Sequence, residues 1–314
     1  MRQDRTSVIE WLLDGDPSIR WQVLRDLEGA AEPVWRAEQD RVSTEGWGAR
    51  LLEHQDEHGR WTSRLYGKKW ISTTYTMVLL RRMGLPRSDL RAIKACQLFL
   101  DEAFGADGGI NTSANHPRSE ACITSMVLAV LYWFEVDDPR RQRVLEHLLG
   151  KQLPDGGWNC DISSGHGSFH TTDSALEALR ECAVVRVPNN DQVEAAETRG
   201  REFMLTHRLF RSHKTGEVVN PQFLRLSFPP HWHHDVLRTL DYFHAARALD
   251  DARLEDAIDV LEKKRREDGK WPLQQRWPGE TWFEMETVGE PSRWNTLRAT
   301  RVLEAWRAGR PHPI

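Results

Sequence analysis

A short turn motif recurs about every fifty residues, and this period restricts the possible folds more than any other feature of the sequence. Two intact copies of the form Q-x3-G-x-W lie at Gln55–Trp61 and Gln152–Trp158, and Arg265–Trp271 has Arg in place of Gln. Phe104–Ile110 keeps the glycine turn without the tryptophan, and Lys214–Val218 is a weaker copy. The last residues of successive copies are 49, 48, 60 and 53 residues apart. Such a period is typical of architectures built from repeated supersecondary units.

Amphipathic runs flank each turn. Their apolar residues recur at three- and four-residue steps, and no run alternates as a strand would, so each is predicted to be a helix. The runs that follow the turns are Thr73–Met83, Cys122–Phe134, His170–Cys182, His234–Leu249 and Trp294–Trp306. Those that precede the turns include Leu90–Ala103, Arg140–Gln152 and Leu254–Glu267. Asp16 before Pro17 predicts the start of a further helix that runs through Leu27.

Five such helical pairs and an N-terminal pair predict an all-α fold, an α/α toroid of about six hairpins in two concentric layers. The length alone allows two domains. No linker rich in Gly, Pro or Ser divides the chain, however, so we expect one domain over residues 1–314. Within it, residues 1–45 would form a HEAT-like helical pair, residues 46–306 the five repeats, and residues 307–314 a tail.

Composition excludes several classes of protein. Lys plus Arg is 43 and Asp plus Glu is 47, and this near balance argues against a nucleic-acid partner. No apolar run approaches the ~20 residues of a membrane span, and the N-terminus lacks a signal-peptide pattern. The four cysteines show neither CxxC motifs nor disulfide spacing. We therefore expect a cytoplasmic protein with reduced cysteines that acts on a small molecule.

Residues of the type that bind metals align when the second helices of the repeats are compared. Thr73, Cys122 and His170 each lie 12 residues after the end of their turn, and the apolar pattern places His234 and Trp294 in the same column. In a toroid these helices would form the inner ring, with the column at one height around the cavity. One thiolate and two imidazoles suit zinc, and three protein ligands leave a fourth position open. We predict one zinc ion bound by Cys122, His170 and His234, although a core cysteine and capping histidines would give the same pattern.

A charged helix face lies below this column. Side chains at i, i+4 and i+7 share a face, which places Arg238, Arg298 and Arg301 on the cavity side as candidate ligands for a phosphate, diphosphate or carboxylate. The alternative is that Glu177 and Asp241 pair with them and only hold the ring together. The 18-residue loop from Trp277 to Trp294 is long enough for a lid. The candidate substrate-binding aromatics are Trp70, Trp232, Trp282 and Trp294.

The Q-x3-G-x-W turns resemble the QW motifs of the terpene-cyclase and protein-prenyltransferase superfamily over roughly residues 46–306. This resemblance implies the toroid and says little about the reaction. The chain lacks the DxDD acid of triterpene cyclases, because the nearest match, Val136–Pro139, follows a helix end. In the β subunits of prenyltransferases an Asp, a Cys two residues later and a His hold zinc. Glu120, Cys122 and His170 match, with Glu in place of Asp, and the resemblance also implies a second subunit as a protein partner.

These observations favour a zinc-dependent transferase or cyclase, or a hydrolase, that activates a thiol or water. Its substrate would be amphipathic or anionic, such as an isoprenoid diphosphate. Glu120 or Asp173 would move the proton, and Tyr75 is a third catalytic candidate. The alternatives are a metal-free terpenoid cyclase or lyase that uses Asp173, Asp235 or Glu177 as acid, a non-catalytic scaffold, and a glycan-processing (α/α)-barrel.

Overall fold

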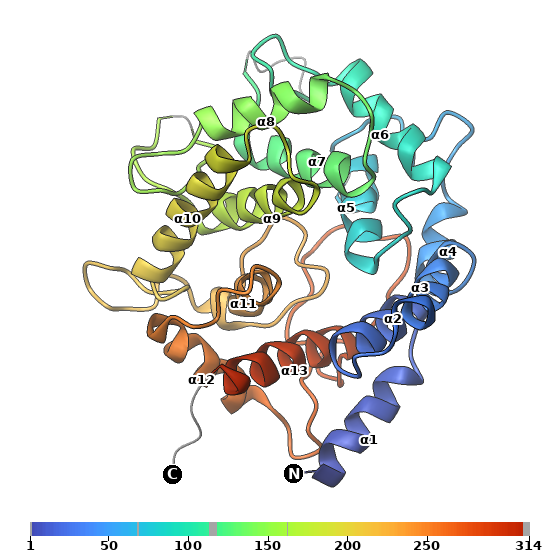
Figure 1. Ribbon diagram of the computed structural model, residues 1–314, viewed down its shortest axis with the longest axis vertical. Coiled ribbons are helices and arrows are strands. Elements are labelled where there is room, and N and C mark those ends of the chain that lie inside the picture. The colour runs from blue at the N-terminus through green and yellow to red at the C-terminus, as the bar shows by residue number, and fades with distance from the viewer. Residues whose placement is uncertain (1, 68, 113–117, 162, 310–314) are drawn as a thin grey trace.

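The helices form a closed ring with an inner and an outer layer (Figure 1). The computed structural model describes residues 2–67, 69–112, 118–161 and 163–309. Over these residues extended structure is limited to isolated bridges, so the all-α prediction is confirmed. The inner helices are α2 (Pro17–Asp26), α5 (Thr73–Met83), α7 (Ala121–Trp133), α9 (Phe169–Val185), α11 (Val236–Ala245) and α13 (Arg293–Ala308).

The outer helices cover the inner ring and alternate with its members along the chain. They are α1 (Arg2–Leu13), α3 (Glu32–Asp40), α4 (Gly46–Leu52), α6 (Leu90–Glu102), α8 (Arg140–Gly150), α10 (Asn190–Thr206) and α12 (Glu255–Lys264). Short 3-10 turns are η1 (Arg41–Ser43), η2 (Pro221–Leu224) and η3 (Ala252–Leu254). None of the described helices combines the length and apolarity needed to cross a bilayer. The predicted tail lies mostly outside the described residues, which end at 309.

Helix α2 closes the ring by lying between α13 and α5. The indole Nε1 of Trp21 donates to the carbonyl of Met83 at the end of α5, at 2.8 Å. On its other side Arg301 of α13 donates to Gln22 at 3.0 Å. The N-terminal pair is therefore part of the ring.

The predicted bounds of the inner helices hold to within three residues except at α11. Thr73–Met83 is confirmed at both ends. Asp16 caps α2 as expected and accepts a hydrogen bond from the Ser18 N–H. The prediction of a helix over His234–Leu249 is wrong at both ends, since α11 spans Val236–Ala245. Asp235 caps this helix by accepting from the Arg238 N–H, so His234 lies before it.

The recurring turns tie each outer helix to its neighbours. Each tryptophan donates from indole Nε1 to a backbone carbonyl ten residues earlier, at 2.6 to 2.9 Å: Trp61 to Leu51, Trp158 to Leu148 and Trp271 to Leu261. Gln152 Nε2 donates to the carbonyl of Gly156 within the turn and to that of Ala196 in the next outer helix. Gln55 makes the same pair of bonds, to Gly59 and Arg91. The turns therefore explain why the helical pairs stack side by side.

A threonine near the start of four inner helices, α5, α7, α9 and α13, reveals the true register of the repeats. Its hydroxyl accepts from the N–H of the residue that ends the preceding turn, at 3.0 to 3.2 Å: Thr73 from Trp61, Thr124 from Ile110, Thr172 from Trp158 and Thr296 from Trp271. Thr73 is thus equivalent to Thr124 and Thr172, whereas the sequence had aligned it with Cys122 and His170. The predicted column is wrong by two residues in the first repeat, because its loop is two residues shorter.

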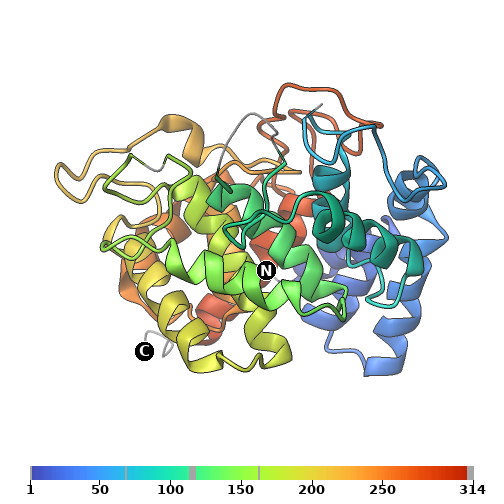
Figure 2. The same cartoon turned by 90° about the horizontal axis from the view of Figure 1, so that it is seen from above.

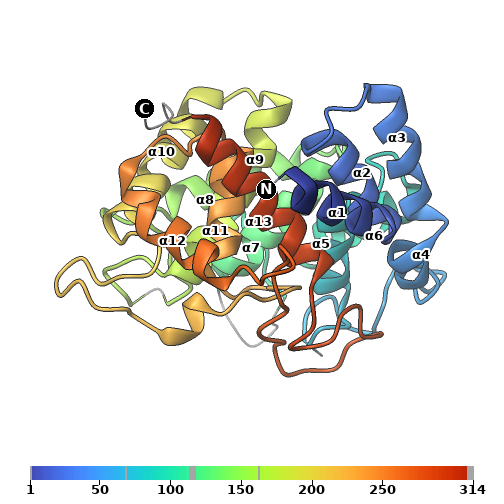
Figure 3. The ribbon, with the colours of Figure 1, turned by 90° about the horizontal axis from the view of Figure 1, so that it is seen from below.

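The long connections gather on the side of the ring where the inner helices begin (Figures 2 and 3). The loop between Trp277 and Ser292 projects there, next to the connection that leads into α11. Residues 84–89 and 134–139, at the other side, are short connections. The two ends of the ring therefore differ in how much chain is available to cover them.

Candidate functional site

A cavity of about 630 Å³ lies inside the ring, towards the ends of α2, α5, α7 and α9. Arginines dominate its described lining: Arg25, Arg81, Arg82, Arg87, Arg180, Arg238, Arg247, Arg298 and Arg301. The acidic residues of the lining are Asp26, Glu177, Glu181 and Asp241. Nine guanidinium groups against four carboxylates leave an excess of five positive charges, with His244 neutral. The aromatic members are Trp21, Trp133, Phe228, Tyr242 and Trp294.

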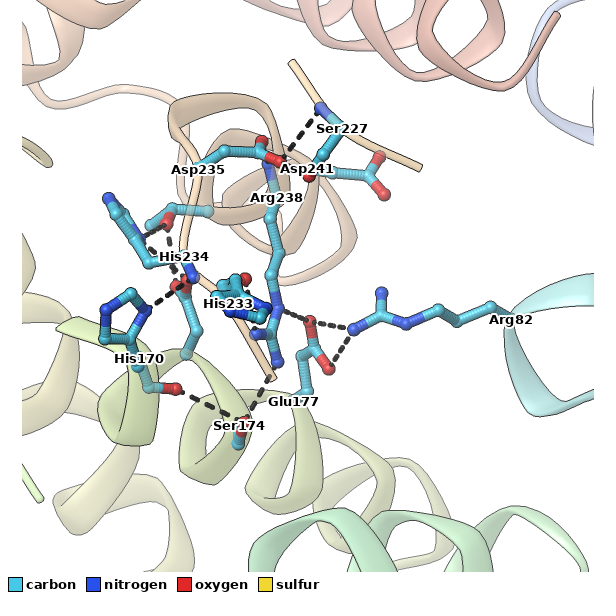
Figure 4. A network of polar contacts seen from close by, with 12 residues as sticks. Arg82, His170, Ser174, Glu177, Ser227, His233, His234, Asp235, Arg238 and Asp241 are labelled. Atoms are coloured by element: carbon cyan, nitrogen blue, oxygen red, sulfur yellow. Dashed lines mark hydrogen bonds and ion pairs between the residues drawn. The ribbon is translucent and has the colours of Figure 1, made fainter. Parts of the chain in front are cut away.

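Three of these arginines surround Glu177 of α9, and Figure 4 shows the contacts made by Arg82 and Arg238. Arg238 Nε and Arg82 Nη2 each donate to its carboxylate at 2.8 Å, and Arg81 Nη2 does so at 3.3 Å. Burial opposes the charged form, but Arg238 and Arg82 hold the pKa of Glu177 well below its ordinary value. Burial, together with the charges of Arg238 and Arg81, lowers the pKa of Arg82 to about 10 despite Glu177. Arg81 Nη1 also donates to Glu181 at 2.7 Å, so two carboxylates serve three cations and the group keeps one excess positive charge.

A second group surrounds Asp241 of α11. Arg301 binds this carboxylate in a bidentate way, with Nε to Oδ1 at 2.7 Å and Nη2 to Oδ2 at 2.8 Å. Arg301 Nη1 also donates to Asp26 of α2 at 2.8 Å, and Arg298 Nε lies 3.4 Å from Asp241. Burial opposes the charge of Asp241, but Arg301 and Arg298 keep its pKa below the ordinary value. These pairs join α2, α11 and α13 around the cavity.

Arg298 has hydrogen-bonding capacity that the described chain does not use. Its side chain is buried, with the residue only 2% exposed, and Nη1 donates to the Ser227 carbonyl at 3.3 Å. Its Nη2 finds no acceptor among the described residues. Leaving a buried charged donor unsatisfied costs about 1–3 kcal/mol or more.

The structure brings the predicted Arg238, Arg298, Arg301 and Trp294 together in this cavity. The two predicted roles of the arginines, in the cavity and in ion pairs, are compatible. These side chains pair with Glu177 and Asp241, and they also line the cavity. Sequence reasoning missed Arg81 and Arg82, which also line the cavity. When the register is corrected by two residues, position 71 replaces Thr73 in the aligned column. Arg82 lies 11 residues after this position, just as Trp133 lies 11 residues after Cys122. The corrected alignment would therefore have predicted Arg82 at the cavity.

The predicted zinc ligands are only partly brought together. The His234 N–H donates to His170 Nδ1 at 2.8 Å, and His234 Nδ1 lies 2.8 Å from Asp173 Oδ2. Cys122, in contrast, forms a disulfide with Cys160, so the expectation of four reduced cysteines is wrong for this pair. Nowhere in the described ranges do three or more His, Cys, Asp or Glu side chains group as a metal ion requires. The side chains do not fit the three-ligand site, and the zinc content itself stays a prediction.

The predicted catalytic residues lie outside the lining of the large cavity. Asp173 is buried and accepts from Thr239 Oγ1 at 2.7 Å as well as contacting His234. Tyr75 is buried with its hydroxyl 3.0 Å from that of Tyr66, and burial raises its pKa. Glu120 directly precedes α7. All three lie where inner helices begin, away from the arginines.

Stacked aromatic rings and histidines lie at that end of the ring. Trp70 stacks on His231 with ring centroids 3.8 Å apart, and His233 lies between Trp232 and Trp277 at 3.8 and 3.4 Å. Burial, and the neighbouring His233, hold the pKa of His231 well below its ordinary value. Burial, together with His170, lowers the pKa of His233 to about 3. Stacking of this kind favours a closed, tightly packed end of the ring over an open entrance to the cavity.

The remaining predicted aromatics therefore divide between packing and a second pocket. Trp232 contacts His170 and His233 within the stack. Trp282 stacks on His54 at 4.3 Å and donates to Thr76 Oγ1 at 3.3 Å. Trp70 and Trp282 also line a small pocket under the loop that begins at Trp277. Of the four predicted aromatics, Trp294 alone lines the large cavity.

No protein-family model matches the sequence, and no curated protein does. Solved structures with a distantly similar course of helices include a protein from Actinoplanes, at 17% identity over 98% of this chain and 99% of that chain, with a TM-score of 0.48. A variant of the type II terpene cyclase MstE from Scytonema, in complex with geranylgeranyl dihydroxybenzoate, has 15% identity over 98% and 97% of the two chains, with a TM-score of 0.48. The apo form of MstE has 12% identity over 87% and 97%, with a TM-score of 0.35.

Proposed function

We propose that the protein binds a small organic polyanion, a phosphate or diphosphate ester, in the arginine-lined cavity. The observation that carries this proposal is the excess of five positive charges around a space of about 630 Å³. Guanidinium groups bind phosphate oxygens in bidentate geometry, and a cleft lined by one sign of charge concentrates ligands of the opposite sign.

The buried position of the arginines strengthens this argument. Arg238 and Arg298 are each 2% exposed, so their charges are poorly screened by water. The lowered pKa of Arg82 shows that burial and the cations Arg238 and Arg81 disfavour its charged form. A bound anion would relieve this repulsion.

The lining also suits an apolar group attached to the anion. Trp21, Trp133, Phe228 and Trp294 face the same space as the arginines. An isoprenoid diphosphate, the substrate class expected from the sequence, combines an anionic head with an apolar body. We propose this class as the first to test.

Binding is tested by isothermal titration with inorganic diphosphate, geranyl diphosphate and neutral geraniol. We expect both diphosphates to bind, geraniol to bind at least tenfold more weakly than its diphosphate, and affinity to fall as NaCl is raised. Arg298→Gln should weaken diphosphate binding about tenfold or more, since a charged hydrogen bond contributes roughly 1.5–3 kcal/mol.

Arg307→Gln is the matched control, because Arg307 lies on the same helix but outside the cavity, with a side chain 55% exposed. It should bind like the wild type. No binding of either diphosphate, or equal affinity in wild type and Arg298→Gln, would overturn the proposal. Product analysis of the geranyl diphosphate samples, with and without chelator, distinguishes zinc-dependent from metal-free turnover, and metal analysis of the protein tests the zinc prediction.

A further inference from the structure

Phe228 separates the arginine-lined cavity from a second, smaller pocket. Its side chain lines both spaces, which have volumes of about 630 and 40 Å³. The ring is 5% exposed and stacks on Trp294, with centroids 4.1 Å apart and planes 13° apart. Among the described residues Phe228 is thus the one common to both linings, whereas Trp294, on which its ring stacks, lines the large cavity and not the small pocket.

The smaller pocket is apolar inside and lies between α5 and the loop that begins at Trp277. Its apolar lining comprises Leu51, Trp70, Leu79, Phe228, Pro229, Trp282, Phe283 and Met285. Its one buried carboxylate, Glu286, is already bound to the start of α13. Glu286 accepts from Ser292 Oγ at 2.5 Å and from the Arg293 N–H at 2.6 Å. The helix terminus offsets its charge only in part, since burial still raises the pKa of Glu286, while the rest of the described lining is mostly hydrocarbon.

We propose that this pocket takes the apolar end of the same ligand whose anionic end is held by the arginines. The inference rests on the proposed function and specifies its substrate class: an amphiphile with a phosphate or diphosphate head and a hydrocarbon tail long enough to pass Phe228. The shared wall supports one occupant for both spaces, since a tail that turns the Phe228 ring aside joins them.

The pocket must enlarge to take such a tail. A volume of about 40 Å³ holds a few atoms at most. Its wall on the loop side is formed by Phe283 and Met285, which are only half-buried and can shift at lower cost than the core. Each methylene that leaves water for this pocket should strengthen binding about fourfold.

The test is isothermal titration of the full chain with inorganic diphosphate and with prenyl diphosphates of five, ten, fifteen and twenty carbons, below their micelle concentrations. We expect affinity to rise with tail length. Met285→Trp fills the pocket from the loop. It should weaken the binding of the longest-tailed ligands at least tenfold and leave the affinity for inorganic diphosphate unchanged. Val288→Trp is the matched control, because Val288 lies on the same loop, 49% exposed and outside the pocket lining.

A second variant, at Phe228, tests the inference independently of the loop. Phe228→Leu removes the shared ring and should favour the fifteen-carbon over the five-carbon ligand more strongly than the wild type does, with thermal unfolding as the check on folding. If inorganic diphosphate binds but tail length, Met285→Trp and Phe228→Leu change nothing, this inference is overturned and the proposed function stands. If no diphosphate binds, both are overturned.

Discussion

Lowering the pH from 7 to 5 should destabilise the protein through the histidines packed where the inner helices begin. His231 is 6% exposed and stacks on Trp70. Burial, His233 and the charges of Arg82 and Arg238 hold its pKa well below 6.5. Burial and His234 lower the pKa of His170 to about 4. His170 therefore stays neutral in the folded protein at pH 5, and the environment of His231 favours its neutral form in the same direction.

The direction of this pH effect on stability follows from the number of protons that the folded and unfolded states bind. In the unfolded chain these histidines have a pKa near 6.5, so below that pH the unfolded state binds more protons and stability falls. At pH 5, about 1.5 pH units below the unfolded pKa, the neutral His170 costs about 2 kcal/mol, and the lowered pKa values of His231 and His233 add to this loss. Total stabilities are of order 5–15 kcal/mol, so the loss is large. Glu177 and Asp241, with lowered pKa values, contribute stability that is lost only below about pH 4.5.

The assay is urea unfolding followed by tryptophan fluorescence between pH 7 and pH 5. His231→Asn removes one of these groups and keeps a residue that tolerates the positive φ of 51° at this position. It should lose less stability than the wild type over this range, because its unfolded chain has one fewer histidine to protonate. His58→Asn, at a side chain 73% exposed, is the control and should behave as the wild type. A stability that is flat from pH 7 to pH 5, or an equal loss in His231→Asn, would refute the reasoning.

Three further changes probe the ring itself. Thr172→Val removes the acceptor for the buried Trp158 N–H and should cost about 1–3 kcal/mol in urea unfolding, whereas Thr206→Val on the exposed face of α10 should cost under 0.5 kcal/mol. Glu177→Gln leaves Arg238 and Arg82 without their carboxylate and should destabilise the protein by about 3–5 kcal/mol. Diphosphate should raise the melting temperature of this variant more than that of the wild type. An unchanged stability would contradict the buried pairing. Reductant should lower the melting temperature of the wild type by an amount equivalent to about 2–4 kcal/mol. The Cys122→Ala, Cys160→Ala double variant should be unaffected. Equal responses of the two proteins would argue against the disulfide.

Helical periodicity predicted the inner helices well because their apolar faces are buried against a continuous ring. Thr73–Met83 was placed at both ends, since Gly84 adopts a positive φ of 80° and ends the helix. At α11 the apolar pattern extends beyond the helix, and the cap at Asp235 overrides it. Local hydrogen bonds of this kind decide helix bounds that periodicity leaves open.

The site was predictable only in part. Arg238, Arg298 and Arg301 were placed by spacing within single helices, and the structure puts all three at the cavity. The column of Cys122, His170 and His234 required the register between helices, which depends on loop lengths and on the Thr73 hydroxyl bond. The partner of Cys122 depends on the path of the loop that carries Cys160, and no spacing along the chain determines that path.

The closure of the ring by α2 has a consequence for the order in which the molecule can be assembled. Arg301 contacts Gln22 and Asp26 across 279 and 275 residues of sequence. Most of the hairpins stack on neighbours that are close in sequence, but this seam must wait until nearly the whole chain has been synthesised. Since Arg298 and Arg301 are on the last helix to arrive, two of the nine arginines in the described cavity lining are added only at that moment. A nascent chain that stops before α13 would therefore be a helical arc with an open edge and without the second arginine group.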